Sequence, residues 1–226
     1  MFLRILIFTS QVEAYSAAAA LRCESGSWSG AHETGRSTPG RVMILPDSRA
    51  KVEEDMELWH HHLKAKLVGS NVEATIQDMP DPYAFNTKRY ETRWLRYMVN
   101  ELVLSPDTLV VAHGTAADGV LRFIEGHEVW GAVLVCCGGE LYHAGERHGR
   151  DYLWSIMRRN CPWIAMVHAE QNAVVGREEA MRMKAALHVP SQLFRELPGP
   201  AVRLRESVGS LVEVEELVAN VLDVRL

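Results

Sequence analysis

The 226-residue chain has no run of 18 or more apolar residues, which excludes a conventional membrane-spanning helix. It also has no excess of basic residues. Its 24 Lys and Arg stand against 29 Asp and Glu, whereas a dedicated nucleic-acid-binding domain carries surplus positive charge. No internal repeat of fixed period is present. We therefore expect neither a membrane span nor nucleic acid as a partner.

Cysteine is scarce, and its spacing gives neither a disulfide framework nor a metal site. Of the four cysteines, Cys136 and Cys137 are adjacent and cannot easily bridge each other. A reducing compartment is therefore the default, which favours the cytoplasm. A chain of this length can bury a sizeable core without disulfides or metal, and we expect no metal and no cofactor.

The first forty residues differ in composition from the rest. An apolar run over residues 2–8 is broken by Arg4, and an alanine run over residues 17–20 is followed by Ser, Gly, His and Thr. The arginine interrupts what would be the apolar core of a secretory signal, and three acidic residues are unusual in a transit peptide. We favour a flexible N-terminal extension over residues 1–40, with organellar targeting as the alternative and the compartment left open.

From residue 41 to residue 226, short apolar runs alternate with amphipathic ones. The predicted strands are Val42–Leu45, Val72–Gln77, Thr108–His113, Ala132–Cys136, Trp163–Val167 and Gln192–Leu197. The predicted helices are Val52–Val68, Thr87–Val103, Ala116–Glu125, Tyr152–Arg159, Gly176–Leu187 and Val212–Leu222. Strand and helix in alternation, with continuous apolar strands, predict one α/β domain: a three-layer α/β/α sandwich around a mostly parallel, doubly wound sheet of about six strands.

Ligands of an open parallel sheet bind at the carboxyl ends of its strands, so candidate functional residues should lie in the segments that follow the strands. The most informative one follows the third strand, where a buried run passes through a tight turn into a helix. This is the setting of the G-x-S-x-G nucleophile elbow. Here the five elbow positions read Ala112-His113-Gly114-Thr115-Ala116, with glycine in place of the serine.

Ordered landmarks along residues 41–226 resemble the retinoblastoma-binding-protein-like serine hydrolases, a single-domain branch of the α/β-hydrolase fold. They are Met79-Pro80-Asp81-Pro82, Glu91-Thr-Arg-Trp94-Leu95 with Met98 and Glu101-Leu102, Ala112-His113, Leu121-Arg122-Phe123 with Ala132–Val135, Glu146-Arg147, and Asn160-Cys161-Pro162. The resemblance implies the α/β-hydrolase fold. It also implies a serine nucleophile, an acid after a later strand and a histidine near the C-terminus.

None of these catalytic residues occupies its expected position. The serine position falls on Gly114, the acid position on Asn172 and the histidine position on Pro200, and no histidine follows His188. The glycine-rich loop that helps form the oxyanion pocket reads Pro46-Asp-Ser-Arg-Ala-Lys51. We therefore predict a hydrolase scaffold without its catalytic triad, because a nucleophile without a general base is weak.

Two residues near the elbow are candidate replacement nucleophiles. Thr115 lies one position late and is expected to point away from the old pocket. Cys136 follows the fourth strand, but a buried cysteine more often acts as a small apolar side chain. What remains of the site is a vestigial pocket, to which we assign Asp47, Ser48, His113, Thr115 and Cys136.

Other polar clusters have simpler explanations than catalysis. His60, His61 and His62 are consecutive on a predicted helix and fan around it, so they cannot converge on one metal. Residues 140–148, with two histidines and two glutamates, are expected to form a solvated cap loop. Glu213, Glu215 and Glu216 are expected to form the exposed face of the last helix.

The leading hypothesis is a catalytically inactive protein that acts as a binding or scaffolding module, with an unidentified protein partner or a small ligand in the vestigial pocket. Arg147, Arg150, Arg158 and Arg159 are a candidate basic edge for a partner. The L-x-C-x-E motif of the resembled family is absent, because the corresponding stretch reads Leu102-Val-Leu-Ser-Pro106. The alternatives are an active esterase or peptidase using Cys136 or Thr115, and a structural subunit of a larger assembly.

Overall fold

A computed structural model describes residues 37–47, 58–80, 87–137, 141–143, 146–148, 152–172, 175–200, 211–224 and 226. The proposed N-terminal extension and the pocket residue Ser48 therefore lie outside the described residues, apart from residues 37–40. The fold below is that of the segment from Thr38 onward. No helix in this described part combines the length and apolarity that crossing a membrane requires.

The domain is built on one six-stranded parallel sheet of strand order β2-β1-β3-β4-β7-β8. Its strands are β1 (Arg41–Leu45), β2 (Glu73–Ile76), β3 (Thr108–His113), β4 (Gly131–Val135), β7 (Ile164–Gln171) and β8 (Phe194–Pro200). All six residues of β3 and all five of β4 are buried, as expected of central strands covered on both faces. The predicted sheet is confirmed.

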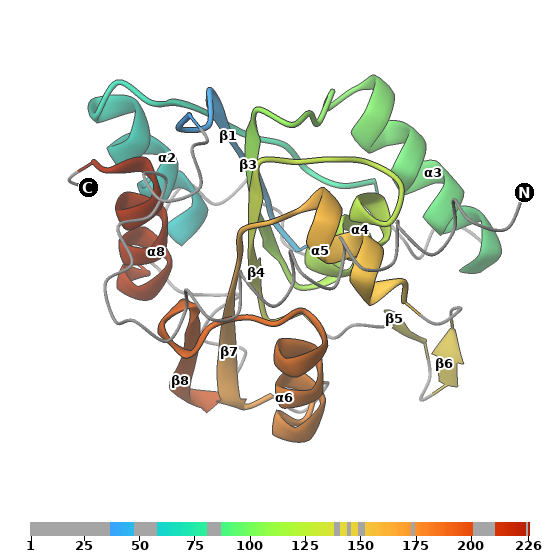
Figure 1. Ribbon diagram of the computed structural model, residues 1–226. Helices are drawn as coiled ribbons and strands as arrows, with labels where there is room; N and C mark the ends of the chain where they lie inside the picture. The colour runs from blue at the N-terminus through green and yellow to red at the C-terminus, as the bar shows by residue number, and fades with distance from the viewer. Residues whose placement is uncertain are drawn as a thin grey trace, which may run out of the picture. The chain divides into compact units, whose positions relative to one another are not determined.

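Helices cover both faces of the sheet, which gives the predicted three layers (Figure 1). They are α2 (Trp59–Gly69), α3 (Thr87–Asn100), α4 (Thr115–Ile124), α5 (Trp154–Asn160), α6 (Arg177–Ala186) and α8 (Val212–Leu222), with a short 3-10 turn, η2, over Ser191–Leu193. Helices α2 and α8 lie on one face and α3, α4 and α5 on the other (Figure 1). An ion pair between Lys66 and Glu215, with Nζ and Oε2 2.6 Å apart, joins α2 to α8.

Several of the sequence landmarks have structural roles in this architecture. Trp94 of α3 is buried and donates from Nε1 to the carbonyl of Pro80 at 2.7 Å, so it fixes α3 against the segment after β2. A Cβ added at Gly119 of α4 would lie 2.5 Å from Trp94 Cε3, so only glycine allows this contact between α3 and α4. Asn160 is buried and donates from Nδ2 to the carbonyl of Ile124 at 2.9 Å.

Two sequence predictions about surface segments were wrong. The expected cap loop contains a two-stranded antiparallel sheet, formed by β5 (Leu141–His143) and β6 (Glu146–His148). Three-residue strands leave no periodicity to detect, which explains the error. Glu215 is not exposed: it is buried, because the aliphatic residues around it on α8 pack on the sheet and Lys66 supplies the compensating charge.

Candidate functional site

The order of the strands fixes where a site should lie. From β1 the chain passes to β2 on one side, whereas β3, β4, β7 and β8 follow on the other side, so the winding direction changes between β1 and β3. The carboxyl ends at such a switch point form the usual ligand crevice of a doubly wound sheet. Asp47 follows β1, and Gly114 follows β3, so both lie at this point.

Gly114 has the backbone conformation of a nucleophile elbow. Its φ of 56° and ψ of −123° are strained for any residue with a Cβ, and it is the N-cap of α4 directly after β3. Its N–H donates to the carbonyl of Val135 on the neighbouring strand at 2.8 Å. The backbone of an elbow is therefore present, but its central residue has no side chain that could act as a nucleophile.

The space beside Gly114 is filled by the side chain of Asp47. A Cβ at Gly114 would lie 2.6 Å from Asp47 Oδ2 and 2.8 Å from its Cγ, well inside van der Waals contact. The other carboxylate oxygen, Oδ1, accepts a hydrogen bond from Thr115 Oγ1 at 2.9 Å. Both side chains are buried. A carboxylate therefore lies where a serine side chain would begin.

The sequence led us to expect the Thr115 side chain to point away from the old pocket; in the structure its hydroxyl contacts the carboxylate of Asp47. Thr115 is the first residue of α4, and the short step from β1 to β3 brings Asp47 within reach. The sequence does show an acidic residue, Asp47, soon after β1 in the loop expected to supply the oxyanion pocket. Sequence alone, however, does not show that this residue contacts the elbow.

Cys136 directly follows β4, and its thiol is unsuited to act as a nucleophile. Burial is the largest effect on its pKa; together with the nearby charge of Asp47, and against the opposing effect of a backbone hydrogen bond at Ala169, it raises the pKa of Cys136 to about 12. The reactive form of cysteine is the thiolate, so this thiol stays protonated at neutral pH.

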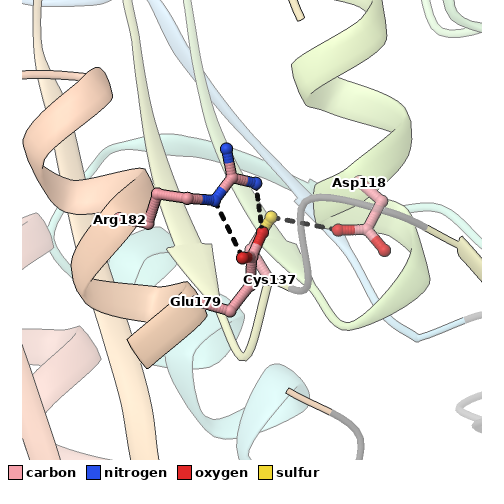
Figure 2. A network of polar contacts seen from close by, with 4 residues as sticks. All are labelled: Asp118, Cys137, Glu179 and Arg182. Atoms are coloured by element: carbon pink, nitrogen blue, oxygen red, sulfur yellow. Dashed lines mark hydrogen bonds and ion pairs between the residues drawn. The ribbon is translucent and has the colours of Figure 1, made fainter. Parts of the chain in front are cut away.

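The next residue, Cys137, donates from Sγ to Asp118 Oδ1 of α4 at 3.1 Å, as Figure 2 shows. The same view contains an ion pair within α6, where Arg182 Nε donates to Glu179 Oε2 at 2.9 Å (Figure 2). Both Asp118 and Cys137 are buried. We therefore assign this pair to packing at the end of β4.

Three other site residues named from the sequence have contacts of their own. His113 is buried, but its ring packs against Trp59 and His60 of α2, with ring centroids 5.9 and 5.5 Å away. Asn172 follows β7, and its Oδ1 accepts a hydrogen bond from the Val175 N–H at 3.1 Å, a local turn. Pro200 ends β8.

The three consecutive histidines of α2 point in different directions. His60 is buried, His61 is half-buried and His62 is exposed, as the predicted fan around α2 requires. No group of three or more His, Cys, Asp or Glu side chains could hold a metal ion in the described part of the chain. In the candidate basic edge, Arg158 and Arg159 are on α5, whereas the side chains of the other two arginines lie outside the described residues.

Comparisons with known proteins agree with this geometry at the level of fold and ancestry. No family model matches the chain. Over 93 residues, 39% of this chain, it is 32% identical to serine hydrolase RBBP9 of Rattus norvegicus. The match spans 48% of that relative, so the chain spans about half the length of the curated relative it matches. The two are homologous over this segment.

Solved structures extend the likeness to most of the chain. The ydeN gene product of B. subtilis superimposes with a TM-score of 0.66 at 18% identity, covering 81% of this chain and 98% of that one. The chain has the α/β-hydrolase fold. Est1E of Butyrivibrio proteoclasticus has a TM-score of 0.52 at 13% identity, covering 82% of this chain and 88% of that one. At such low sequence identities, the structural similarity is evidence for the fold alone.

Proposed function

We propose that this chain is a non-hydrolytic protein with a serine-hydrolase scaffold that acts as a binding or scaffolding module. The observation that carries the proposal is the pairing of Gly114 with Asp47. The elbow has no nucleophile, and the Asp47 carboxylate occupies the space a serine side chain would need.

The electrostatics at the elbow support the same conclusion. An oxyanion pocket stabilises developing negative charge with hydrogen-bond donors. Here the buried carboxylate of Asp47 lies at the elbow instead, and it already accepts a hydrogen bond from the Thr115 hydroxyl. Negative charge developing on a substrate carbonyl would be repelled rather than stabilised.

The triad positions on β7 and β8 support it as well. The amide of Asn172 is engaged in its own turn and carries no charge to orient a base. Pro200 has no group that could accept a proton, and general-base catalysis needs such a group within hydrogen-bonding reach of the nucleophile.

A second candidate function rests on the hydrogen bond between Thr115 and Asp47. The Asp47 carboxylate accepts a hydrogen bond from the Thr115 hydroxyl at 2.9 Å, and a general base that activates this hydroxyl would need the same arrangement. In this alternative Thr115 Oγ1 attacks an ester or amide carbonyl, and Asp47 takes its proton and passes it to the departing alcohol or amine. Water, deprotonated by Asp47, then attacks the acyl-threonine, the carboxylic acid leaves, and the proton returns to Thr115 Oγ1. The burial of both side chains disfavours it, because substrate must reach them.

One experiment separates the two functions. The purified protein is treated with a fluorophosphonate and assayed for turnover of short-chain esters, and adducts are located by intact mass and peptide mapping. The proposal predicts no adduct and no turnover above the buffer rate. Turnover that Thr115→Val abolishes and Thr115→Ser retains would establish the second function, whereas an adduct elsewhere would overturn both.

A matched variant tests the reason for inactivity. Gly114→Ser restores a serine but leaves Asp47 against it, whereas Gly114→Ser with Asp47→Ala also clears the space. We expect both to remain inactive in ester turnover, because no base replaces the missing histidine. Substantial activity in the double variant would contradict the idea that several parts of the machinery are missing together.

A further inference from the structure

A buried aromatic cluster holds the first turn of α2 against the end of β3. The imidazole of His60 stacks on Trp59 with ring centroids 3.8 Å apart, and it lies 5.5 Å from the ring of His113. All three side chains are buried, and His60 is fully so. His113 is the last residue of β3, so this cluster lies next to the elbow at Gly114.

Among the residues that the structure describes, neither Nδ1 nor Nε2 of His60 has a hydrogen-bond partner, which is rare for a buried imidazole. The titratable groups that act on it are His113 from β3 and His61 from α2, and both oppose a positive charge. The amino end of a helix opposes it too, because the macrodipole is positive there.

We propose that His60 is an acid-sensitive latch, whose protonation releases the first turn of α2 from β3 and frees His113, the residue that leads into the elbow. The proton comes from solvent and binds a ring nitrogen, with no other bond made or broken. The latch goes beyond the proposed function and operates whether or not the protein hydrolyses anything.

The direction of the effect follows from linkage. Burial, and then the two neighbouring histidines, hold the pKa of His60 well below the ordinary value of 6.5. The closed form therefore binds fewer protons than the open form. The closed form is most stable, relative to the open form, above pH 6.5, and this stability is lost as the pH falls from 6.5 toward the lowered pKa of His60. Within that window a single group raises the ratio of open to closed form about tenfold per pH unit.

Hydrogen exchange on the full chain tests the latch. Amide protection at the start of α2, read at the His61 N–H that donates to the Leu58 carbonyl and at the amides that follow it, is compared between about pH 7.5 and about pH 5.5 after correction for intrinsic exchange, with β3 and β4 as internal references. We expect the first turn to lose protection about tenfold per pH unit below pH 6.5 while the reference strands keep theirs. Equal loss in all of them would indicate global acid unfolding and overturn the latch.

Variants identify the titrating group. His60→Leu, which keeps an apolar side chain of similar size, should abolish the pH-dependent loss, and the exposed His62→Leu should retain it. Loss of protection that persists in His60→Leu would refute the assignment. If that variant fails to fold, histidine side-chain NMR on the unmodified protein decides: a His60 that titrates at or above 6.5 in the folded state overturns the proposal.

Discussion

Gly114→Ala is the substitution that most directly tests the occupancy of the elbow by Asp47. The new methyl group would have to exist at φ 56° and ψ −123°, a conformation that costs a residue with a Cβ about 1–3 kcal/mol. It would also lie 2.6 Å from Asp47 Oδ2. Moving the buried Asp47 carboxylate out of the way of this methyl group should cost about 1–3 kcal/mol more, which is what overpacking a protein core costs. The variant should therefore lose about 2–6 kcal/mol of unfolding free energy.

A double-mutant cycle separates the two contributions. Asp47→Ala alone should cost about 1 kcal/mol, because the hydrogen bond from Thr115 is lost. It also removes the carboxylate from the path of the new methyl group, leaving only the Asp47 Cβ at 3.2 Å. The double variant should therefore be more stable than the sum of the single changes by about 1–3 kcal/mol, while the backbone strain remains.

Urea denaturation followed by circular dichroism measures the four free energies. Gly126→Ala is the matched control, since nothing lies within 4 Å of its added Cβ, and it should change stability by less than about 1 kcal/mol. A coupling energy between Gly114 and Asp47 below about 0.5 kcal/mol would refute the reasoning. It would mean that the carboxylate does not occupy the serine's space in solution.

Three further predictions concern residues away from the elbow. Cys136, with its pKa raised to about 12, should resist iodoacetamide at about pH 7.5 in the folded protein and react only in denaturant, as intact mass would reveal, and rapid folded-state alkylation would contradict its burial. Gly119→Ala should destabilise the protein by about 1–3 kcal/mol, because its methyl group meets the ring of Trp94, and an unchanged melting temperature would contradict that contact. Asn160→Leu should cost about 1–3 kcal/mol in urea denaturation, because it leaves the buried carbonyl of Ile124 unpaired, and a neutral result would mean that water replaces the amide.

The sheet could be predicted from the sequence because its central strands are apolar on both faces. Thr108–His113 and Val212–Leu222 were predicted with the observed bounds, since a buried run or a strong helical stripe leaves no competing interpretation. Glu215 shows the limit of such patterns. Charge pattern along one helix says nothing about a lysine on another helix, so the ion pair with Lys66 could not be foreseen.

The candidate site could be predicted in position but not in content. The turn after β3 and the absence of serine at Gly114 are visible in the sequence, because glycine and small flanking residues mark an elbow. Asp47 and Thr115 are 68 positions apart in sequence, and their contact depends on the packing of two strands, which no local pattern encodes. The contact of His60 with His113 could not be foreseen for the same reason, since it depends on how α2 packs on β3.

The ion pair between α2 and α8 has a consequence for synthesis of the chain. Its two residues are 149 positions apart, and α8 is made after every other described element. Until α8 emerges from the ribosome, the face of the sheet that it shares with α2 is only partly covered. A nascent chain with an uncovered apolar face is prone to aggregation and is a substrate for chaperones. Folding of this domain should therefore finish only once α8 has left the ribosome, and a ribosome stalled before Leu211 would hold a sheet with one face partly uncovered.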